Sequence, residues 1–167
     1  DKGYGMSDDD LKDLMNFYDY IEVQPASACS HLIGEDKKFH NTLEYNGYIT
    51  RLVKLAKSMG KLVCATGDVH NLRPEDLIYR KVIVHQKTNS KIHPLNRPDI
   101  ELPNMFFMTT REMLDAFSFL GDDLAKEIVV TNTNKIADMV EPLQIIRDKL
   151  YTPVLENSAE VTKEMVY

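Results

Sequence analysis

The sequence predicts an α/β protein, because two short strands flank an amphipathic helix. Residues 20–24 alternate in hydrophobicity and end at Pro25, which is typical of a short strand. Residues 41–59 place apolar side chains at helical spacing, and Gly60 follows as a helix stop. Residues 61–66 form a compact apolar run, as in strands that are buried on both faces of a parallel sheet. Strand, helix and strand in this order predict a βαβ unit.

A further helix is predicted before this unit. Ser7 has the character of an N-cap, and the acidic residues after it suit the positive end of a helix dipole. The apolar residues of one helical face then follow at the expected spacing: Leu11, Leu14, Met15 and Tyr18. Residues 26–40, between the first strand and the next helix, are expected to form a loop.

Beyond the second strand the patterns predict helices and loops. Pro74 suits the first turn of a helix that carries Leu77, Ile78, Lys81 and Val82. Residues 86–104 contain three prolines and are expected to be irregular. Thr109 and Glu112 have capping-box spacing and open a helix that Gly121 ends.

One more helix is predicted to start at Asp122 or Asp123. Its apolar face includes Asn132 among the following residues: Ala125, Ile128, Val129, Ile136 and Val140. From Pro142 onward the pattern weakens into a linker-like tail. We therefore divide the chain into an α/β part, residues 1–100, and a helical and linker part, residues 101–167.

Composition narrows the classes of function. The 167 residues include 43% hydrophobic and 28% charged residues, which is ordinary for a soluble globular domain. A net charge of −6 argues against a main DNA-gripping surface, since no overall basic field would attract nucleic acid. No apolar run is long enough to span a bilayer, and no signal-peptide pattern is present. Two unpatterned cysteines favour a reducing, cytoplasmic location. A start at Asp1, without methionine, suggests a cut from a longer polypeptide, although processing would look the same.

Asp68 and His70 are the strongest candidates for chemistry. They close the second strand, and side chains at i and i+2 of a strand point the same way, about 6.5–7 Å apart at Cα. Functional groups gather at the carboxyl ends of strands in α/β folds, and Gly67 lets the backbone approach a ligand there. A carboxylate beside an imidazole suits zinc, manganese or iron. The same residues also fit a polar strand end, in which Asp68 caps a turn and His70 is hydrogen-bonded in a loop.

The remaining candidates are explained as well by structure as by function. Glu22 and Gln24 share one face of the first strand and are candidates for the same cavity, or for a solvated sheet edge. Cys64 is expected in the core. Four histidines lack ligand spacing and are expected at the surface or in hydrogen bonds: His31, His40, His85 and His93. A basic cluster is interpreted as a solvated face: Arg73, Arg80, Lys81 and Lys87.

Several stretches together resemble one family, the PolC-type alpha subunit of bacterial DNA polymerase III. They are, in order, residues 18–25, 65–70, 74–76 with 78–80, 94–97, 109–114, 117–121 and 132–138. The resemblance covers nearly the whole chain. It implies the C-terminal part of a polymerase-and-histidinol-phosphatase (PHP) domain, a partial, distorted (β/α) barrel followed by a mainly helical and loop segment that leads toward the polymerase core.

The resemblance also implies a function for the parent protein, namely DNA-directed DNA synthesis with a 3′–5′ proofreading exonuclease inserted upstream. Asp68 and His70 match the family's D-x-H motif and would be the last two ligands of a multinuclear zinc or manganese cluster. Magnesium would serve the polymerase itself. Implied partners are the rest of the polymerase chain, DNA, dNTP and other replisome subunits, with no membrane. No catalytic residue is expected in this chain, which alone would be inactive.

Two alternatives stay open at this point. One is a free-standing metal-dependent phosphoesterase. Such an enzyme needs further metal ligands, and Glu22 is the only plausible one in the first 60 residues of the sequence. The other is a structural scaffold without metal, in which His70 is simply hydrogen-bonded.

Overall fold

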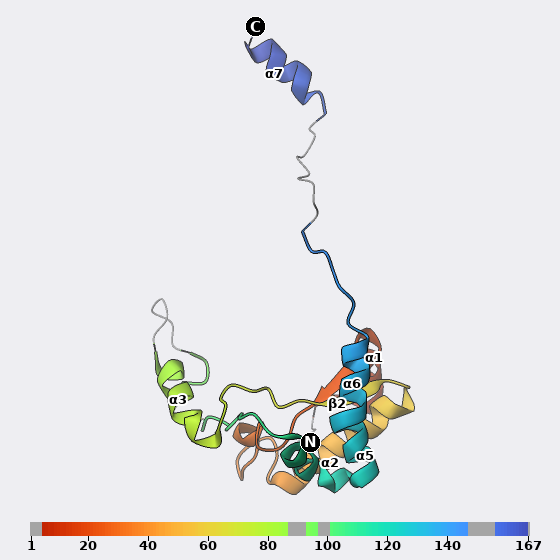
Figure 1. Ribbon diagram of the computed structural model, residues 1–167, viewed down its shortest axis with the longest axis vertical. Coiled ribbons are helices and arrows are strands. Elements are labelled where there is room, and N and C mark those ends of the chain that lie inside the picture. The colour runs from red at the N-terminus through yellow and green to blue at the C-terminus, as the bar shows by residue number, and fades with distance from the viewer. Residues whose placement is uncertain (1–4, 87–92, 97–100, 147–155, 167) are drawn as a thin grey trace.

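The computed structural model describes residues 5–86, 93–96, 101–146 and 156–166, and a two-stranded parallel sheet lies among the helices of its first 60 residues and α6 (Asn132–Asp138) (Figure 1). β1 (Tyr20–Val23) pairs with β2 (Leu62–Ala65) in a register that runs from Tyr20 opposite Leu62 to Val23 opposite Ala65. α2 (Thr42–Ser58) connects the two strands. The predicted βαβ unit is therefore confirmed, and the chain has a mixed α/β fold.

Two helices of the first 60 residues begin where the sequence predicts. In α1 (Asp8–Phe17) the Ser7 side chain accepts a hydrogen bond from the Asp10 backbone N–H, and the Asp10 carboxylate completes the capping box. In α2 the Asn41 side chain caps the backbone N–H of Glu44. α2 buries the apolar face expected of it, with Ile49, Val53 and Ala56 all in the core. α1 buries Leu11 and Met15 but leaves Leu14 and Tyr18 of the predicted face about half exposed.

A nearly continuous helical stretch packs against β2. It consists of α5 (Asp122–Lys126), the π-helical turn η4 (Glu127–Thr131) and α6 (Asn132–Asp138). Asn132, expected on the apolar face, is only 2% exposed, and its Nδ2 donates to the backbone oxygen of Val63 at 2.8 Å. Because the C=O groups of Val63 and Cys64 point to opposite sides in a parallel ladder, this contact covers the outer edge of β2.

The helices between residues 109 and 138 share the core of the βαβ unit. α4 (Thr110–Ala116) begins with the predicted Thr109–Glu112 capping box, and η3 (Ser118–Leu120) leads to Gly121, which has φ of 86°. Phe117 and Ile128 are fully buried in one cluster with Val53 and Val63. We call residues 6–66 and 109–138 the body. The predicted division at residue 100 falls on residues 97–100, which lie outside the described residues.

Within the body, the short helix η1 (Ser30–Leu32) lies in the predicted loop of residues 26–40.

A second region extends from the body. After β2 the chain leaves the body through η2 (Pro74–Asp76) and α3 (Leu77–His85), which Figure 1 shows in green to one side. Only Val84 of α3 is buried, whereas Ile78 and Val82 are 57% and 56% exposed. We call residues 70–86 the α3 arm.

The expectation of a linker-like tail is wrong for its last part, because α7 (Ser158–Val166) is helical. All residues from 156 to 166 are exposed, so helix-forming residues such as Ala159, Glu160 and Met165 specify this helix locally. The described residues contain one two-stranded sheet and two isolated bridges, Ile33 with Phe39 and Asn71 with Phe106. Within the described ranges, no helix combines the length and the apolar character that crossing a membrane requires.

Candidate metal site at Asp68 and His70

A turn, and not an extended strand, brings Asp68 and His70 together. β2 ends at Ala65, and the Thr66 N–H still donates to the Val23 oxygen at 3.0 Å. Asp68 then adopts φ of 44°, in the left-handed region where aspartate is among the tolerated residues. The Asp68 Oδ1 and His70 Nε2 atoms lie 3.4 Å apart, and both side chains are about half exposed. The two side chains that the sequence singled out therefore lie together, but the strand geometry assumed for them is wrong.

Gly67 is closely surrounded at the start of this turn. A Cβ atom at this position would lie 3.3 Å from Cγ2 of Val69 and 3.6 Å from Cε of Met113 on α4. The first distance is tighter than ordinary van der Waals contact, so glycine avoids crowding the Val69 side chain within the turn, whereas the distance to Met113 is an ordinary contact.

Backbone hydrogen bonds hold His70 against a segment that the sequence treated as irregular or left unassigned. The N–H groups of His70 and Asn71 both donate to the Met105 oxygen, at 2.8 and 3.2 Å. The Phe107 N–H donates back to the Asn71 oxygen at 3.0 Å. Residues 105–107 therefore fix the backbone on which the His70 side chain is mounted.

Two asparagines that the sequence analysis did not single out support the same turn. Asn71 is 9% exposed, and its Nδ2 donates to the Arg73 oxygen at 2.7 Å and to Oδ1 of Asn104 at 3.0 Å. Nδ2 of Asn104 in turn donates to the Pro74 oxygen at 2.9 Å. The contact of Asn71 with Arg73 joins residues two positions apart, so a local sequence pattern could have indicated it. Asn104 is 33 residues from Asn71, and no local pattern indicates their contact.

Arg80 also belongs to this site, and its assignment to a solvated basic face is wrong. Its guanidinium Nη1 donates to the Pro103 oxygen at 3.2 Å and contacts Sδ of Met105 at 3.1 Å. Burial lowers the pKa of Arg80, while the negative charge of Asp68 acts in the opposite direction. Arg73 and Lys81 of the same predicted cluster are exposed as expected, and Lys87 lies outside the described residues.

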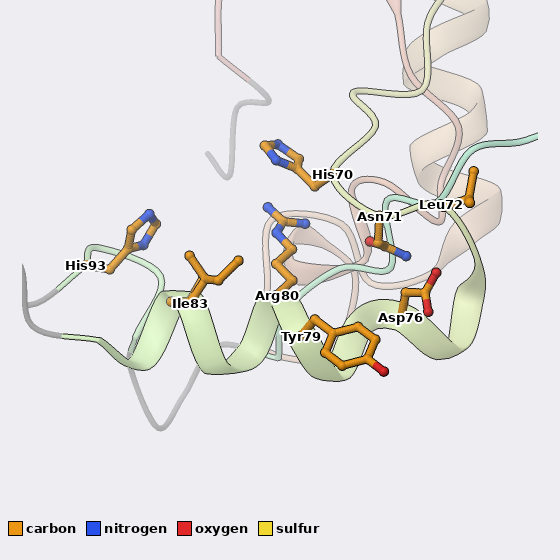
Figure 2. A pocket seen from close by; sticks show the side chains of 9 residues that line it. His70, Asn71, Leu72, Asp76, Tyr79, Arg80, Ile83 and His93 are labelled. Carbon is orange, nitrogen blue, oxygen red and sulfur yellow. The ribbon is translucent and has the colours of Figure 1, made fainter.

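Side chains that include His70, Asn71 and Arg80 line a cavity of about 460 Å³ between the turn and α3. In Figure 2 the guanidinium of Arg80 points from α3 toward the imidazole of His70, and His93 faces the same space from the other end of the helix. Tyr79, Ile83 and Asp76 complete much of the wall. His93, expected at the surface or in a hydrogen bond, is exposed, and its Nδ1 accepts from the Leu95 N–H at 3.1 Å; it lines the same cavity as His70.

The other sequence candidates lie elsewhere. Glu22 accepts a hydrogen bond from the Thr66 hydroxyl at 3.2 Å, and Oε1 of Gln24 accepts one from Cys29 Sγ at 3.4 Å. Cys64 is buried as expected, and burial together with the Glu22 charge raises the pKa of its thiol to about 11. His40 and His85 are exposed and hydrogen-bond to backbone oxygens. His31 is half-buried, and burial with the charges of Lys37 and Arg80 lowers its pKa.

The geometry of Asp68 and His70 suits two ligands of one metal ion. With bonds of about 2.1 Å to each, donor atoms 3.4 Å apart would subtend an angle of roughly 110° at the metal, which is close to tetrahedral. Across the described ranges, however, no three histidine, cysteine, aspartate or glutamate side chains are grouped so as to hold an ion. The pair fits part of a metal site and needs ligands beyond these residues.

Comparison with known proteins identifies relatives of the chain. No protein-family model matches it. DNA polymerase III PolC-type of Bacillus subtilis is 45% identical over 161 residues, which are 96% of this chain and 11% of that protein. The PolC-type polymerases of Listeria monocytogenes and Streptococcus sanguinis are 42% and 37% identical, over 92% and 93% of this chain. The chain spans about one tenth of the length of these relatives. Nearly all of it is therefore homologous to one segment of DNA polymerase III of the PolC type.

Proposed function

We propose that the chain is a segment of a bacterial replicative DNA polymerase, in which it completes a metal-bearing PHP domain and braces the polymerase core. The similarity to PolC-type polymerases over more than nine tenths of the chain carries this proposal. In the parent protein we infer DNA-directed DNA synthesis with magnesium, a 3′–5′ exonuclease, binding of DNA and dNTP, contacts with other replisome subunits, and a cytoplasmic location. None of these activities is assigned to residues of this chain.

The sheet supports the proposal that the α/β part is a portion of a larger barrel. A parallel pair of two strands is marginal by itself and is normally part of a wider sheet. Asn132 covers the outer edge of β2, whereas Tyr20 and Glu22 direct their backbone N–H and C=O groups toward the outer edge of β1. Further strands of the same domain would pair at β1.

Within this domain Asp68 and His70 would hold a divalent ion, zinc or manganese, together with residues from other segments. A bound ion there can tie strand ends together, because its binding energy becomes folding energy, or it can polarise a phosphoryl oxygen. The chain itself orients the two side chains that would bind the ion. The backbone of His70 is fixed by Met105, and the carboxylate of Asp68 lies beside the imidazole.

Metal analysis of the full-length polymerase tests this proposal. We expect stoichiometric zinc or manganese in the unchanged protein, and loss of one ion or more in both Asp68→Ala and His70→Ala. His85→Ala, which changes an exposed histidine of α3, is the matched control and should keep full occupancy. If the polymerase holds metal that neither substitution affects, Asp68 and His70 are not ligands.

Two outcomes would favour other functions. Tight stoichiometric metal on the 167-residue chain alone would support a free-standing metal-dependent phosphoesterase. A full-length protein without metal at these residues would support a scaffold, since the 3.4 Å contact is also suitable for a simple pair between a carboxylate and a protonated imidazole.

A further inference from the structure

The His70 side chain depends on its own backbone for its direction. A metal-binding histidine usually donates its second ring N–H to a carboxylate or a backbone carbonyl, and this contact fixes the ring. Among the described residues, the one polar contact of the His70 ring is with Oδ1 of Asp68. The chain therefore holds this imidazole through the N–H groups of His70 and Asn71, which both donate to the Met105 oxygen.

Two asparagine side chains join the same two segments of the chain. Nδ2 of Asn71 donates to Oδ1 of Asn104 at 3.0 Å, between residues 33 positions apart. The orientation of both amides is fixed, because each Nδ2 also faces a backbone oxygen, which can only accept. That oxygen belongs to Arg73 for Asn71, at 2.7 Å, and to Pro74 for Asn104, at 2.9 Å. We call Asn71 and Asn104 the amide clamp.

The segment that carries Asn104 is anchored independently of the clamp. Leu102, Pro103 and Met105 are buried, and Nη1 of Arg80 donates to the Pro103 oxygen at 3.2 Å. Asn104 itself is half-buried, and its amide contacts the turn. Because burial holds the rest of the segment, loss of the Asn104 amide would release the turn without unfolding the segment.

We propose that the amide clamp positions the metal site, with Asn104 as a positioning residue that keeps His70 directed toward the ion it shares with Asp68. This inference rests on the proposed function of the Asp68–His70 pair. Asn71 follows His70 directly in the chain, so a shift of the clamp changes the direction of the His70 Cα–Cβ bond. Ligands must be held within about 0.5 Å of their binding geometry, so a small shift of this bond weakens binding.

The zinc affinity of the full-length polymerase tests this role. The ion concerned is the one that Asp68→Ala and His70→Ala release, and its affinity is measured by competition with a chromogenic chelator. We expect Asn104→Ala to weaken it roughly 3- to 30-fold, somewhat less than the roughly 10- to 100-fold loss typical of groups that hydrogen-bond a ligand directly.

The matched control is Asn134→Ala, which removes an amide bond to a backbone oxygen on the exposed side of α6. It should leave the zinc affinity within about twofold, because surface substitutions away from a site have small effects. Equal weakening by Asn104→Ala and Asn134→Ala would overturn the proposal, since the loss would not depend on contact with the turn.

A spectroscopic readout separates positioning from a general loss of stability. Cobalt(II) is used in place of zinc, because its visible absorption changes with coordination geometry. The difference spectrum against Asp68→Ala isolates the ion that this pair binds. At saturating cobalt we expect Asn104→Ala to shift the bands and Asn134→Ala to keep them, while urea unfolding of the 167-residue Asn104→Ala chain stays close to that of the unchanged chain. A weaker affinity with an unchanged spectrum would overturn the positioning role.

A double-mutant cycle tests whether the two amides act through each other. Asn71→Ala should weaken zinc binding at least as much as Asn104→Ala. The double variant should lose less than the product of the two single losses, as residues in contact do. Losses that multiply would mean independent roles and would overturn the clamp. If Asn71→Ala disturbs the fold by circular dichroism, Asn71→Ser takes its place in the cycle.

The outcomes separate this inference from the proposed metal site. If Asp68→Ala and His70→Ala release zinc while Asn104→Ala keeps its affinity and its cobalt spectrum, the metal site stands and the clamp does not position it. If none of these three substitutions affects the bound metal, the proposed metal site fails and the positioning role fails with it.

Discussion

The body and the α3 arm of this chain are held in place by different interactions. In the body, side chains from α2, η4 and the end of α4 bury one another completely, with Val53, Ile128 and Phe117 at 0% exposed. The arm buries only Val84 of α3 and is fixed to residues 103–107 mainly by hydrogen bonds from His70, Asn71 and Arg80. The body is thus stabilised by apolar burial, whereas the arm depends on directed polar contacts and surrounds a cavity. Binding groups are found where packing is incomplete.

The largest expected effect is in the body. Phe117→Ala removes a fully buried ring from the shared core and should lower the free energy of unfolding by about 3–5 kcal/mol, through lost burial and the cavity left behind. Urea denaturation measures this change. Phe107→Ala, which truncates a 60% exposed ring close to the arm, should cost less than about 1 kcal/mol. Similar losses in the two variants would show that body and arm do not differ in this way.

A smaller effect is expected at the polar contact inside the body. Asn132→Ala leaves the Val63 oxygen without its donor, which should cost about 1–3 kcal/mol. The matched variant is Asn134→Ala on the exposed side of α6, where the same change should cost almost nothing. Thermal and urea unfolding of the pair give the comparison. A neutral Asn132→Ala would mean that water replaces the amide and that the β2 edge is open.

The smallest effect on global stability is expected in the arm. Asn104→Ala removes the bonds to Asn71 and to the Pro74 oxygen, but it lies at a half-buried position. We expect less than about 1 kcal/mol in global unfolding, with faster amide hydrogen exchange confined to the arm, because local opening needs less free energy there. Exchange measured by mass spectrometry on peptides from residues 70–86 and from α2 tests this. Faster exchange in both would indicate one cooperative unit.

Elements that depend on local sequence were predicted well. Ser7 and Thr109 cap the helices that they were expected to cap, and α2 begins close to its predicted start, where Asn41 caps it; each cap has its partner three residues away. The apolar spacing of α2 and the run at β2 were sufficient to predict a parallel βαβ unit. α7 was missed because its nine residues follow a proline-containing stretch and contribute nothing to the core.

The candidate site was predicted only in part. Asp68 and His70 could be singled out because they are two residues apart at the end of a strand. The Asn71–Asn104 contact and the contacts of Arg80 with Pro103 and Met105 could not be predicted, since they join residues 23–33 positions apart. No periodic pattern reports such contacts.

The sequence by itself determined the βαβ unit and the helix starts, and it singled out Asp68 and His70 as neighbours, because turn residues and apolar periodicity act over a few neighbouring positions. The tertiary structure decided that Asn132 covers the β2 edge, that residues 103–107 carry the α3 arm, and that Arg80, His70 and His93 face one cavity. Hydrogen bonds and burial between distant segments select these arrangements, and they form only once the chain has folded around its core.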